Sequence, residues 1–266
     1  MVSVLIALSL AEPALIARVD DKDLTESSGV AASVFAPQEF WTHNDSGDKA
    51  RLFRFNLKGE ITARVMVDAK AHDWEDMEIV RRGGSSTVYV ADIGDNSRRR
   101  KSVTIIAFPE PRGSGDVAKP TLYELTYPDG PRDAESFAVD PKTGAFYIVE
   151  KVNGPSGVYA LDKPKPGENK LRRVGAITTS SIVPMSKLTT GASFSPDGKH
   201  VVVRGYLGAY LFAVPDKDRA WWKSTGSRLD LRPERQGEAI CFSRDSRWLY
   251  TTSEGRPCEV SRVQVP

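Results

Sequence analysis

The chain has 266 residues, of which 40% are hydrophobic and 27% charged, so it has enough apolar side chains for a sizeable folded core. Its formal net charge of +2 is too small for the strongly basic surface of a typical nucleic-acid-binding protein. With only two cysteines, Cys241 and Cys258, it cannot have a disulfide framework, and the two lie on predicted strands that a third strand separates. The 21 glycines and 17 prolines fall between short apolar runs, which favours many strands over long helices.

The first residues resemble the end of a secretory signal peptide. Residues 2–10 form an apolar run, and Ser9, Leu10 and Ala11 follow a small-x-small cleavage pattern, although a basic segment in front of the run is missing. Nine residues are too few to span a bilayer, so no stable membrane insertion is expected. We therefore predict a signal-peptide remnant at 1–11, a secreted or periplasmic protein, and one monomeric domain over 12–266. A buried first strand is the alternative for the apolar run.

A strand–turn–strand unit recurs five times, which is typical of repeat architectures such as β-propellers. The predicted first strands are 26–30, 75–79, 135–139, 190–194 and 238–242. The second strands are 39–43, 87–91, 145–149, 200–204 and 248–252. Third strands follow at 51–55, 103–107, 157–161, 209–213 and 259–263. Turns rich in Pro, Asp, Gly and Ser, such as 195–198, supply the backbone conformations that tight hairpins need.

The fourth strands predict how the repeats close into a ring. Four units have a candidate fourth strand, at 61–67, 122–127, 171–177 and 227–231, but the last unit has no residues left for one. The segment 14–19 precedes the first unit and can fill that place, which would leave no open sheet edge where the ends meet. The sequence thus predicts an all-β, five-bladed β-propeller closed by an N-terminal strand in the last blade. The Pro- and Gly-containing segments 109–120 and 164–170 are expected to be loop insertions.

The first residue of each repeat is the candidate metal ligand. The five residues are Glu26, Glu75, Glu135, Thr190 and Glu238. The innermost strands of a propeller run along its central channel, so these carboxylates should converge and repel one another unless they are protonated, paired or neutralised by a cation. An oxygen-only ligand set suits Ca²⁺ before Mg²⁺. A salt-bridged ring and a water-filled polar channel are the alternatives, and Ser27 could replace Glu26 in the ring.

A second layer of polar residues lies just past the second strand of each repeat. Asp92, Asp95, Lys151 and Arg204 are its candidate catalytic residues. The two cations could hold a phosphate or carboxylate group, while the acids could hold a metal or position water. Alternatively, the cations simply pair with neighbouring acids. The sequence contains no G-x-S-x-G elbow, Walker loop or dinucleotide fingerprint, so catalysis would have to use the channel mouth.

Several motifs make the chain similar to a known family. Residues 41–47 (WTHNDSG), 73–77 (DWEDM) and 91–96 (ADIGDN) belong to a set of motifs between about 26 and 262. They resemble those of a family of largely uncharacterised, exported bacterial β-propeller proteins. The chain departs from that pattern at Ser193, where the family usually has aspartate, and at Gly205, where it usually has threonine.

A more distant similarity links the chain to the calcium-activated nucleotidases of the apyrase type, which are five-bladed propellers. That resemblance implies axial calcium bound by Glu75, Glu135, Thr190 and Glu238, with Glu26 or Ser27 completing the ring. A shared propeller does not transfer activity. Two functions are therefore expected as alternatives: a calcium-dependent hydrolase of a phosphorylated or otherwise anionic small molecule, and a non-catalytic ligand- or protein-binding scaffold with a structural metal.

Overall fold

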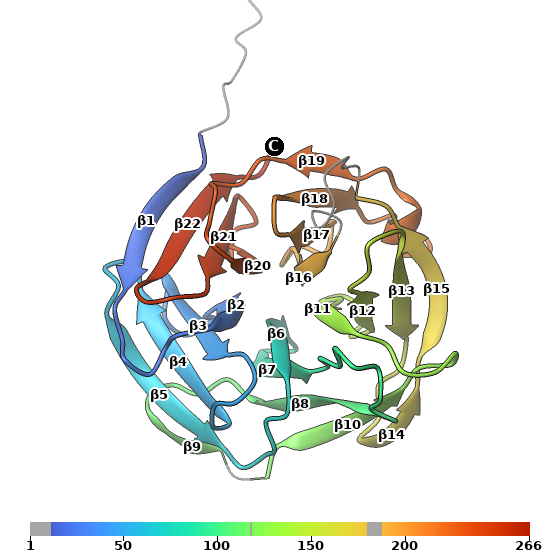
Figure 1. Cartoon of the computed structure of the whole chain (residues 1–266), viewed down its shortest axis with the longest axis horizontal. Coiled ribbons are helices and arrows are strands. Elements are labelled where there is room, and N and C mark those ends of the chain that lie inside the picture. Colours follow the sequence, from blue (N-terminus) through green and yellow to red (C-terminus); the bar gives the residue numbers. More distant parts are fainter. Residues whose placement is uncertain (1–11, 118, 180–187) are drawn as a thin grey trace, which may run out of the picture.

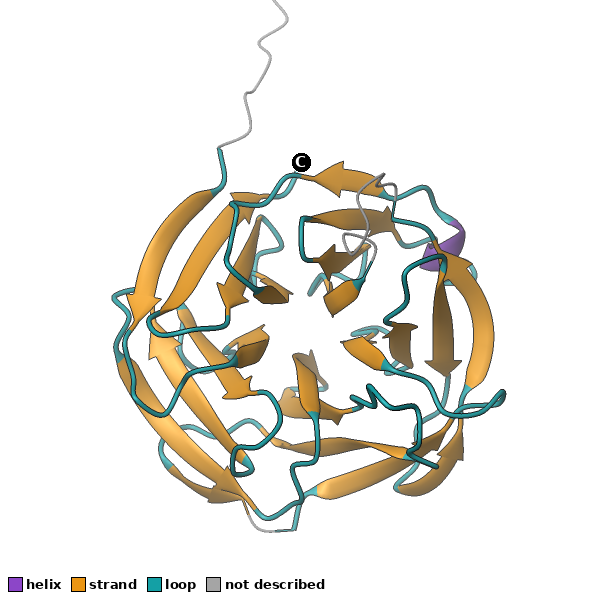
Figure 2. Cartoon of the chain, viewed as in Figure 1, coloured by secondary structure: helices purple, strands orange, loops and turns teal. Residues whose placement is uncertain are grey.

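Five sheets surround a common axis and form the blades of a β-propeller (Figure 1). The computed structural model describes residues 12–117, 119–179 and 188–266, so the predicted signal-peptide remnant at 1–11 lies outside the described residues. Strands make up nearly all of the regular structure, and the short helix η1 (Trp221–Lys223) lies at the rim (Figure 2). The predicted all-β, five-bladed fold is confirmed.

Each blade is a meander of four antiparallel strands numbered from the axis outward. Blade 1 contains β2 (Ser27–Ala32), β3 (Glu39–Asn44), β4 (Arg51–Asn56) and β5 (Ile61–Val67). Blade 2 contains β6 (Trp74–Arg82), β7 (Ser85–Asp92), β8 (Val103–Pro109) and β10 (Thr121–Thr126). Blade 3 contains β11 (Ala134–Val139), β12 (Phe146–Glu150), β13 (Ser156–Leu161) and β15 (Arg172–Ile177). Blade 4 contains β16 (Thr189–Phe194), β17 (His200–Gly205), β18 (Gly208–Ala213) and β19 (Ser227–Leu229).

Blade 5 joins the two ends of the chain. It contains β20 (Gly237–Phe242), β21 (Trp248–Ser253), β22 (Cys258–Gln264) and, outermost, β1 (Ala14–Val19). β1 pairs antiparallel with β22 and covers its open edge, as Figure 1 shows for the dark blue and red strands. The predicted closure of the last blade by the segment 14–19 is therefore confirmed.

The two insertions expected as loops form additional strands. β9 (Gly115–Val117), from the blade 2 insertion, pairs in parallel with β5 of blade 1. β14 (Gly167–Lys170), from the blade 3 insertion, pairs in parallel with β10 of blade 2. Each insertion thus reaches back to the preceding blade and covers the edge of its outermost strand, which an exposed loop would leave open.

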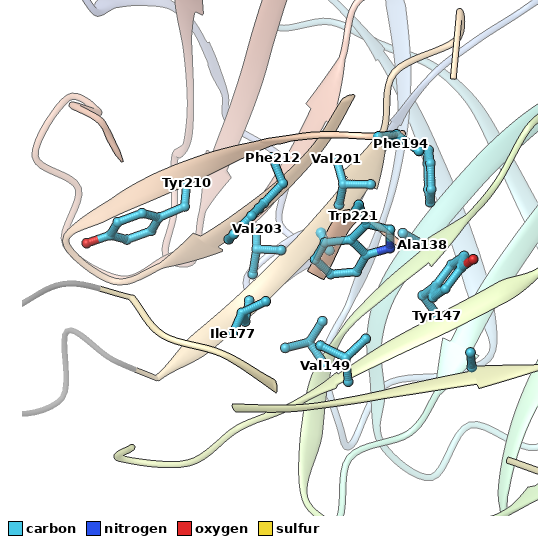
Figure 3. Close-up of a cluster of buried hydrophobic side chains, with 14 of the residues drawn as sticks. Ala138, Tyr147, Val149, Ile177, Phe194, Val201, Val203, Tyr210, Phe212 and Trp221 are labelled. Carbon is cyan, nitrogen blue, oxygen red and sulfur yellow. The ribbon is translucent and has the colours of Figure 1, made fainter. Parts of the chain in front are cut away.

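The blades pack face to face through apolar side chains. Between blades 3 and 4, Trp221 of η1 is fully buried against Tyr147 and Phe212, with ring centroids 5.9 and 5.5 Å away (Figure 3). Each fully buried side chain of this size contributes about 1.5–3 kcal/mol from apolar burial. This packing holds the inner strands in place around the axis.

Cys241 and Cys258 are buried and unbridged, and β21 separates their strands β20 and β22. Among the described residues, no helix has the length and apolar character required to cross a bilayer.

Candidate metal centre at the channel mouth

The ring positions are built by one backbone feature that all five blades share. Each innermost strand has a register shift directly after its first paired residue, which leaves one extra residue facing none on the second strand. The extra residues are Ser28, Glu75, Glu135, Thr190 and Glu238. A β-bulge of this kind bends the strand and redirects the side chain of the extra residue. Five equivalent bulges therefore present one side chain per blade at the same level of the channel.

The first blade differs from the sequence prediction. The register places Ser28 at the ring position, whereas Ser27 pairs with Asn44 and Glu26 lies exposed before β2. Ser28 Oγ donates a hydrogen bond to the carbonyl oxygen of Glu75 at 2.7 Å. The sequence repeat favoured Glu26 because the same position is a glutamate in three other blades. The ring position is instead set by the bulge, whose place depends on how β2 pairs with β3.

Thr190 has the same role as Ser28. Its Oγ1 donates to the carbonyl oxygen of Gly237 at 3.3 Å, so it also links its inner strand to that of the next blade. The two hydroxyl side chains of the ring thus link neighbouring blades. The carboxylates of Glu75, Glu135 and Glu238 are left to interact with other groups.

Three carboxylates gather on one side of the channel mouth. One oxygen from each of Asp45, Asp73 and Glu75 lies within 4.8 Å of the other two. Asp45 follows β3 of blade 1, and the other two belong to the start of blade 2. A Cβ atom at Gly94 would collide with the carboxylates of Glu75 and Asp73, so the backbone of that glycine forms a close-fitting wall of the cluster.

The mouth accumulates more negative charge than its cations balance. Burial, followed by Glu135 and Asp45, raises the pKa of Glu75 well above its usual value. Burial and the neighbouring Asp45 raise the pKa of Asp73 to about 6. Glu254 has a pKa raised to about 7 by burial and by Glu238. At neutral pH Asp73 is still mostly ionised, whereas Glu75 holds its charge only if a positive charge compensates it.

Lys151 is a cation within this layer, and it is already paired. It forms an ion pair with Glu135, and its ammonium lies 5.6 Å from the ring centre of Tyr206. Burial disfavours the ammonium, but the carboxylate of Glu135 outweighs that effect and raises the pKa of Lys151. Burial raises the pKa of Glu135 to about 8, even though Lys151 opposes this shift.

Two buried oxygens at the mouth have no hydrogen-bond partner among the described residues. They are Asp45 Oδ1 and Glu135 Oε2, and only 6% of Glu135 is exposed. Buried polar atoms are nearly always satisfied, so unpartnered oxygens beside an acidic cluster point to a ligand. An all-oxygen donor set with unpartnered atoms fits a hard divalent cation.

Arg204 is buried inside the protein, whereas the predicted role in holding an anion needs it at the mouth of the channel. Its guanidinium pairs with Glu234 and donates to the carbonyl oxygen of Ala239 at 2.8 Å, and both side chains of the ion pair are at most 1% exposed. This arrangement resembles the alternative in which Arg204 is held by a neighbouring acid, although the partner is an acid outside the repeated strands.

Asp92 and Asp95 are occupied by the loop that follows them. Asp92 pairs with Arg100 at 2.7 Å and accepts the backbone N–H of His72 at 3.1 Å. Asp95 accepts the backbone N–H groups of Arg99 and Arg100 at 2.9 and 2.8 Å. Of the four candidate catalytic residues, Lys151 is therefore the one whose contacts are with the ring itself.

Two further buried acids lie on β6 beneath the ring. Asp76 accepts the backbone N–H groups of Phe137 and Ala192, and Glu78 accepts that of Phe194. The inner strands are sheet edges, so their N–H groups facing the axis need acceptors, and these carboxylates supply them. The sequence signal that could have identified these two acids is the segment EDMEIV, where Asp76 and Glu78 alternate with apolar residues after Glu75 within one strand.

Sequence comparisons identify no relative: no protein-family model and no curated protein matches the chain. Comparison with solved structures finds propellers. A candidate gluconolactonase is 14% identical over 97% of this chain and 92% of that structure, with a TM-score of 0.52. A gluconolactonase from Xanthomonas campestris is 15% identical over 92% of this chain and 87% of its own, with a TM-score of 0.49. A luciferin-regenerating enzyme is 11% identical over 96% of both chains, with a TM-score of 0.48. Gluconolactonase-type propellers are thus among the proteins that share this fold.

Proposed function

We propose that the channel mouth binds a divalent cation, Ca²⁺ before Mg²⁺, and that the protein uses it to hydrolyse a small anionic molecule. The observation that carries this proposal is the convergence of Asp45, Asp73 and Glu75 within 4.8 Å, with Asp45 Oδ1 unpartnered among the described residues. Ca²⁺ takes six to eight oxygen ligands in flexible geometry, so three carboxylates would leave coordination positions for water and substrate.

The residues around the carboxylate cluster would bind the substrate and exchange a proton with it. A bound divalent cation would polarise a phosphoryl or carbonyl oxygen of the substrate. Lys151 would attract the substrate's negative charge, since its ammonium is only partly buried beside Glu135. Glu254, with a pKa of about 7, is the half-buried carboxyl suited to exchange a proton near neutral pH.

A non-catalytic scaffold is the second candidate, and one observation favours it. Asp92, Asp95 and Arg204 are all engaged in internal contacts, which leaves few groups for catalysis. In this case the cation would only join blade 1 to blade 2, because Asp45 belongs to one and Glu75 to the other.

Thermal unfolding with metal tests the shared premise. We expect Ca²⁺ to raise the melting temperature of chelator-treated protein, since a ligand at 100 times its Kd adds about 2.7 kcal/mol of stability. Asp45→Asn and Glu75→Gln should abolish that increase, whereas the exposed Glu168→Gln should preserve it. A Ca²⁺ response of equal size in all four proteins would refute the site.

Turnover separates the two candidates. A panel of phosphate esters, nucleotides and sugar lactones would be tested on the Ca²⁺-loaded protein and on Lys151→Met. The hydrolase predicts turnover that the variant loses while still binding Ca²⁺. No turnover on any substrate, combined with stabilisation by Ca²⁺, would support the scaffold instead.

We also propose that the protein is exported. This rests on the apolar run and small-x-small pattern before residue 12. Sequencing the N-terminus of the protein recovered from culture medium and periplasm would test it, because an exported protein should begin close to residue 12.

A further inference from the structure

A second hollow lies at the end of the strands opposite to the metal centre. It is a groove of about 550 Å³ between blades 5 and 1, which are neighbours in Figure 1. Its walls come from the end of β6, the loop before β3, the β20–β21 turn and the outer strands of blade 5. Glu75 and Arg81 are six residues apart on β6, which separates the metal centre from the groove by about 20 Å at about 3.3 Å per residue. This volume is that of a small-molecule site.

Three arginines line the groove without a carboxylate partner. Among the described residues, Arg81, Arg244 and Arg262 have no acid within ion-pair distance. The two acids of the lining are already engaged: Glu39 pairs with Arg54 at 2.7 Å, and Asp245 accepts the hydroxyl of Ser243 at 2.6 Å. The groove thus holds three guanidinium groups that, among the described residues, no carboxylate contacts within ion-pair distance, although Glu78 and Glu110 act on Arg244 from farther away.

The position of Arg244 is fixed rather than free. It lies in the β20–β21 turn, which the Ser243–Asp245 hydrogen bond stabilises, and its Nη1 donates to the carbonyl oxygen of Ile79 at 3.3 Å. Burial lowers the pKa of Arg244, and although Glu78 and Glu110 oppose this shift, they do not reverse it. A bound anion would relieve this unfavourable environment, and guanidinium groups are well suited to phosphate and carboxylate.

The opposite wall of the groove is aromatic. The guanidinium of Arg262 lies 4.4 Å from the ring centre of Trp248, and the rings of Tyr250 and Phe40 lie 4.5 Å apart. Trp248 is partly exposed, so part of its surface remains accessible to a ligand. Planar ligands stack on such rings.

We infer that this groove is a binding site for a small anion carrying a planar ring, with its phosphate or carboxylate held by Arg81 and Arg244 and its ring placed against Trp248. The site is independent of the proposed metal centre, because none of the three carboxylates of the metal cluster lines it. It gives the protein a ligand-binding surface on the face opposite to the channel mouth.

Calorimetric titration with phenyl phosphate tests this assignment. The protein would be treated with chelator and desalted first, so that a metal at the channel mouth cannot bind the probe. We expect one saturable site in the wild type, at least tenfold weaker binding in Arg81→Ala and Arg244→Ala, and weaker binding of inorganic phosphate than of phenyl phosphate.

Arg82→Ala is the matched control. Arg82 follows Arg81 on the same strand, but its guanidinium lies against Gly144 of blade 3, outside the groove lining. This variant should bind phenyl phosphate like the wild type. The assignment is overturned if no saturable binding occurs, if the Arg81→Ala/Arg244→Ala double variant binds normally, or if Arg82→Ala loses as much affinity as Arg81→Ala. Equal affinity for inorganic phosphate would overturn the ring-bearing ligand class.

Discussion

The carboxylate of Asp76 accepts the backbone N–H of Ala192 at 2.9 Å, although the two residues belong to blades 2 and 4. The same oxygen accepts the N–H of Phe137 from blade 3 at 2.8 Å. One side chain therefore satisfies the axis-facing edges of two inner strands on other blades. Because an unpaired buried N–H is costly, this acid fastens three blades together beneath the ring.

Replacing Asp76 by alanine should destabilise the whole propeller. The change leaves the N–H groups of Phe137 and Ala192 buried without acceptors, and each such group costs about 1–3 kcal/mol. We expect the free energy of unfolding in urea to fall by about 2–5 kcal/mol. Asp76→Asn keeps one acceptor oxygen and should lose less. An alanine variant as stable as the wild type would show that the three blades do not depend on this carboxylate.

The Arg204–Glu234 ion pair allows a structural role of Arg204 to be distinguished from a catalytic one. Glu234→Gln removes the charge that compensates a buried guanidinium, and breaking such a pair costs about 3–5 kcal/mol. Thermal and urea unfolding should show this loss, and the Arg204→Met/Glu234→Leu double variant should recover part of it, because no charge is then left buried. If Arg204→Met instead kept full stability and lost turnover, Arg204 would have the catalytic role that its repeat position suggested.

The fold was predictable because the same sequence pattern recurs in all five blades. Alternating apolar strands and tight turns occur five times, and the missing fourth strand identified 14–19 as the closing strand. The strands β9 and β14 were not predictable, because their short segments carry no alternation. They exist because a neighbouring blade offers an open edge, and that is a property of the assembled ring.

The candidate site was only partly predictable. Four of the five ring positions follow from the repeated first residue, but the register needed to choose Ser28 over Glu26 depends on a bulge that strand pairing creates. Asp73 is two residues before Glu75 in the sequence, but Asp45 belongs to blade 1, so only the folded ring brings Asp45 near the other two carboxylates. The partner of Arg204, Glu234, lies outside the repeated strands, and the N–H groups that Asp76 accepts come from two other blades, so neither contact follows from the repeat pattern.

Glu78 should make stability depend on pH. Its carboxyl has a pKa raised to about 8 by burial, from an ordinary value of 4.5, so the folded state binds the proton more tightly than the unfolded state. The stabilisation is therefore complete below about 4.5 and is lost as the pH rises through about 8, at up to about 1.4 kcal/mol per pH unit. Urea unfolding of the wild type across this range should follow that slope, and Glu78→Gln should flatten it. A slope identical in both proteins would assign the pH dependence to other acids of the channel.

Removing the closing strand should convert the propeller into a self-associating protein. β1 pairs with β22 from Ala14 to Val19, and Arg18 adds an ion pair with Glu259 at 3.1 Å. A chain that starts at residue 20 would expose the outer edge of β22, and an unpaired edge pairs readily with other chains. We expect a lower melting temperature and concentration-dependent oligomers in light scattering, whereas a chain that starts at residue 12 retains β1 and should show neither. A shortened chain that stayed monomeric and equally stable would mean that blade 5 is complete with three strands.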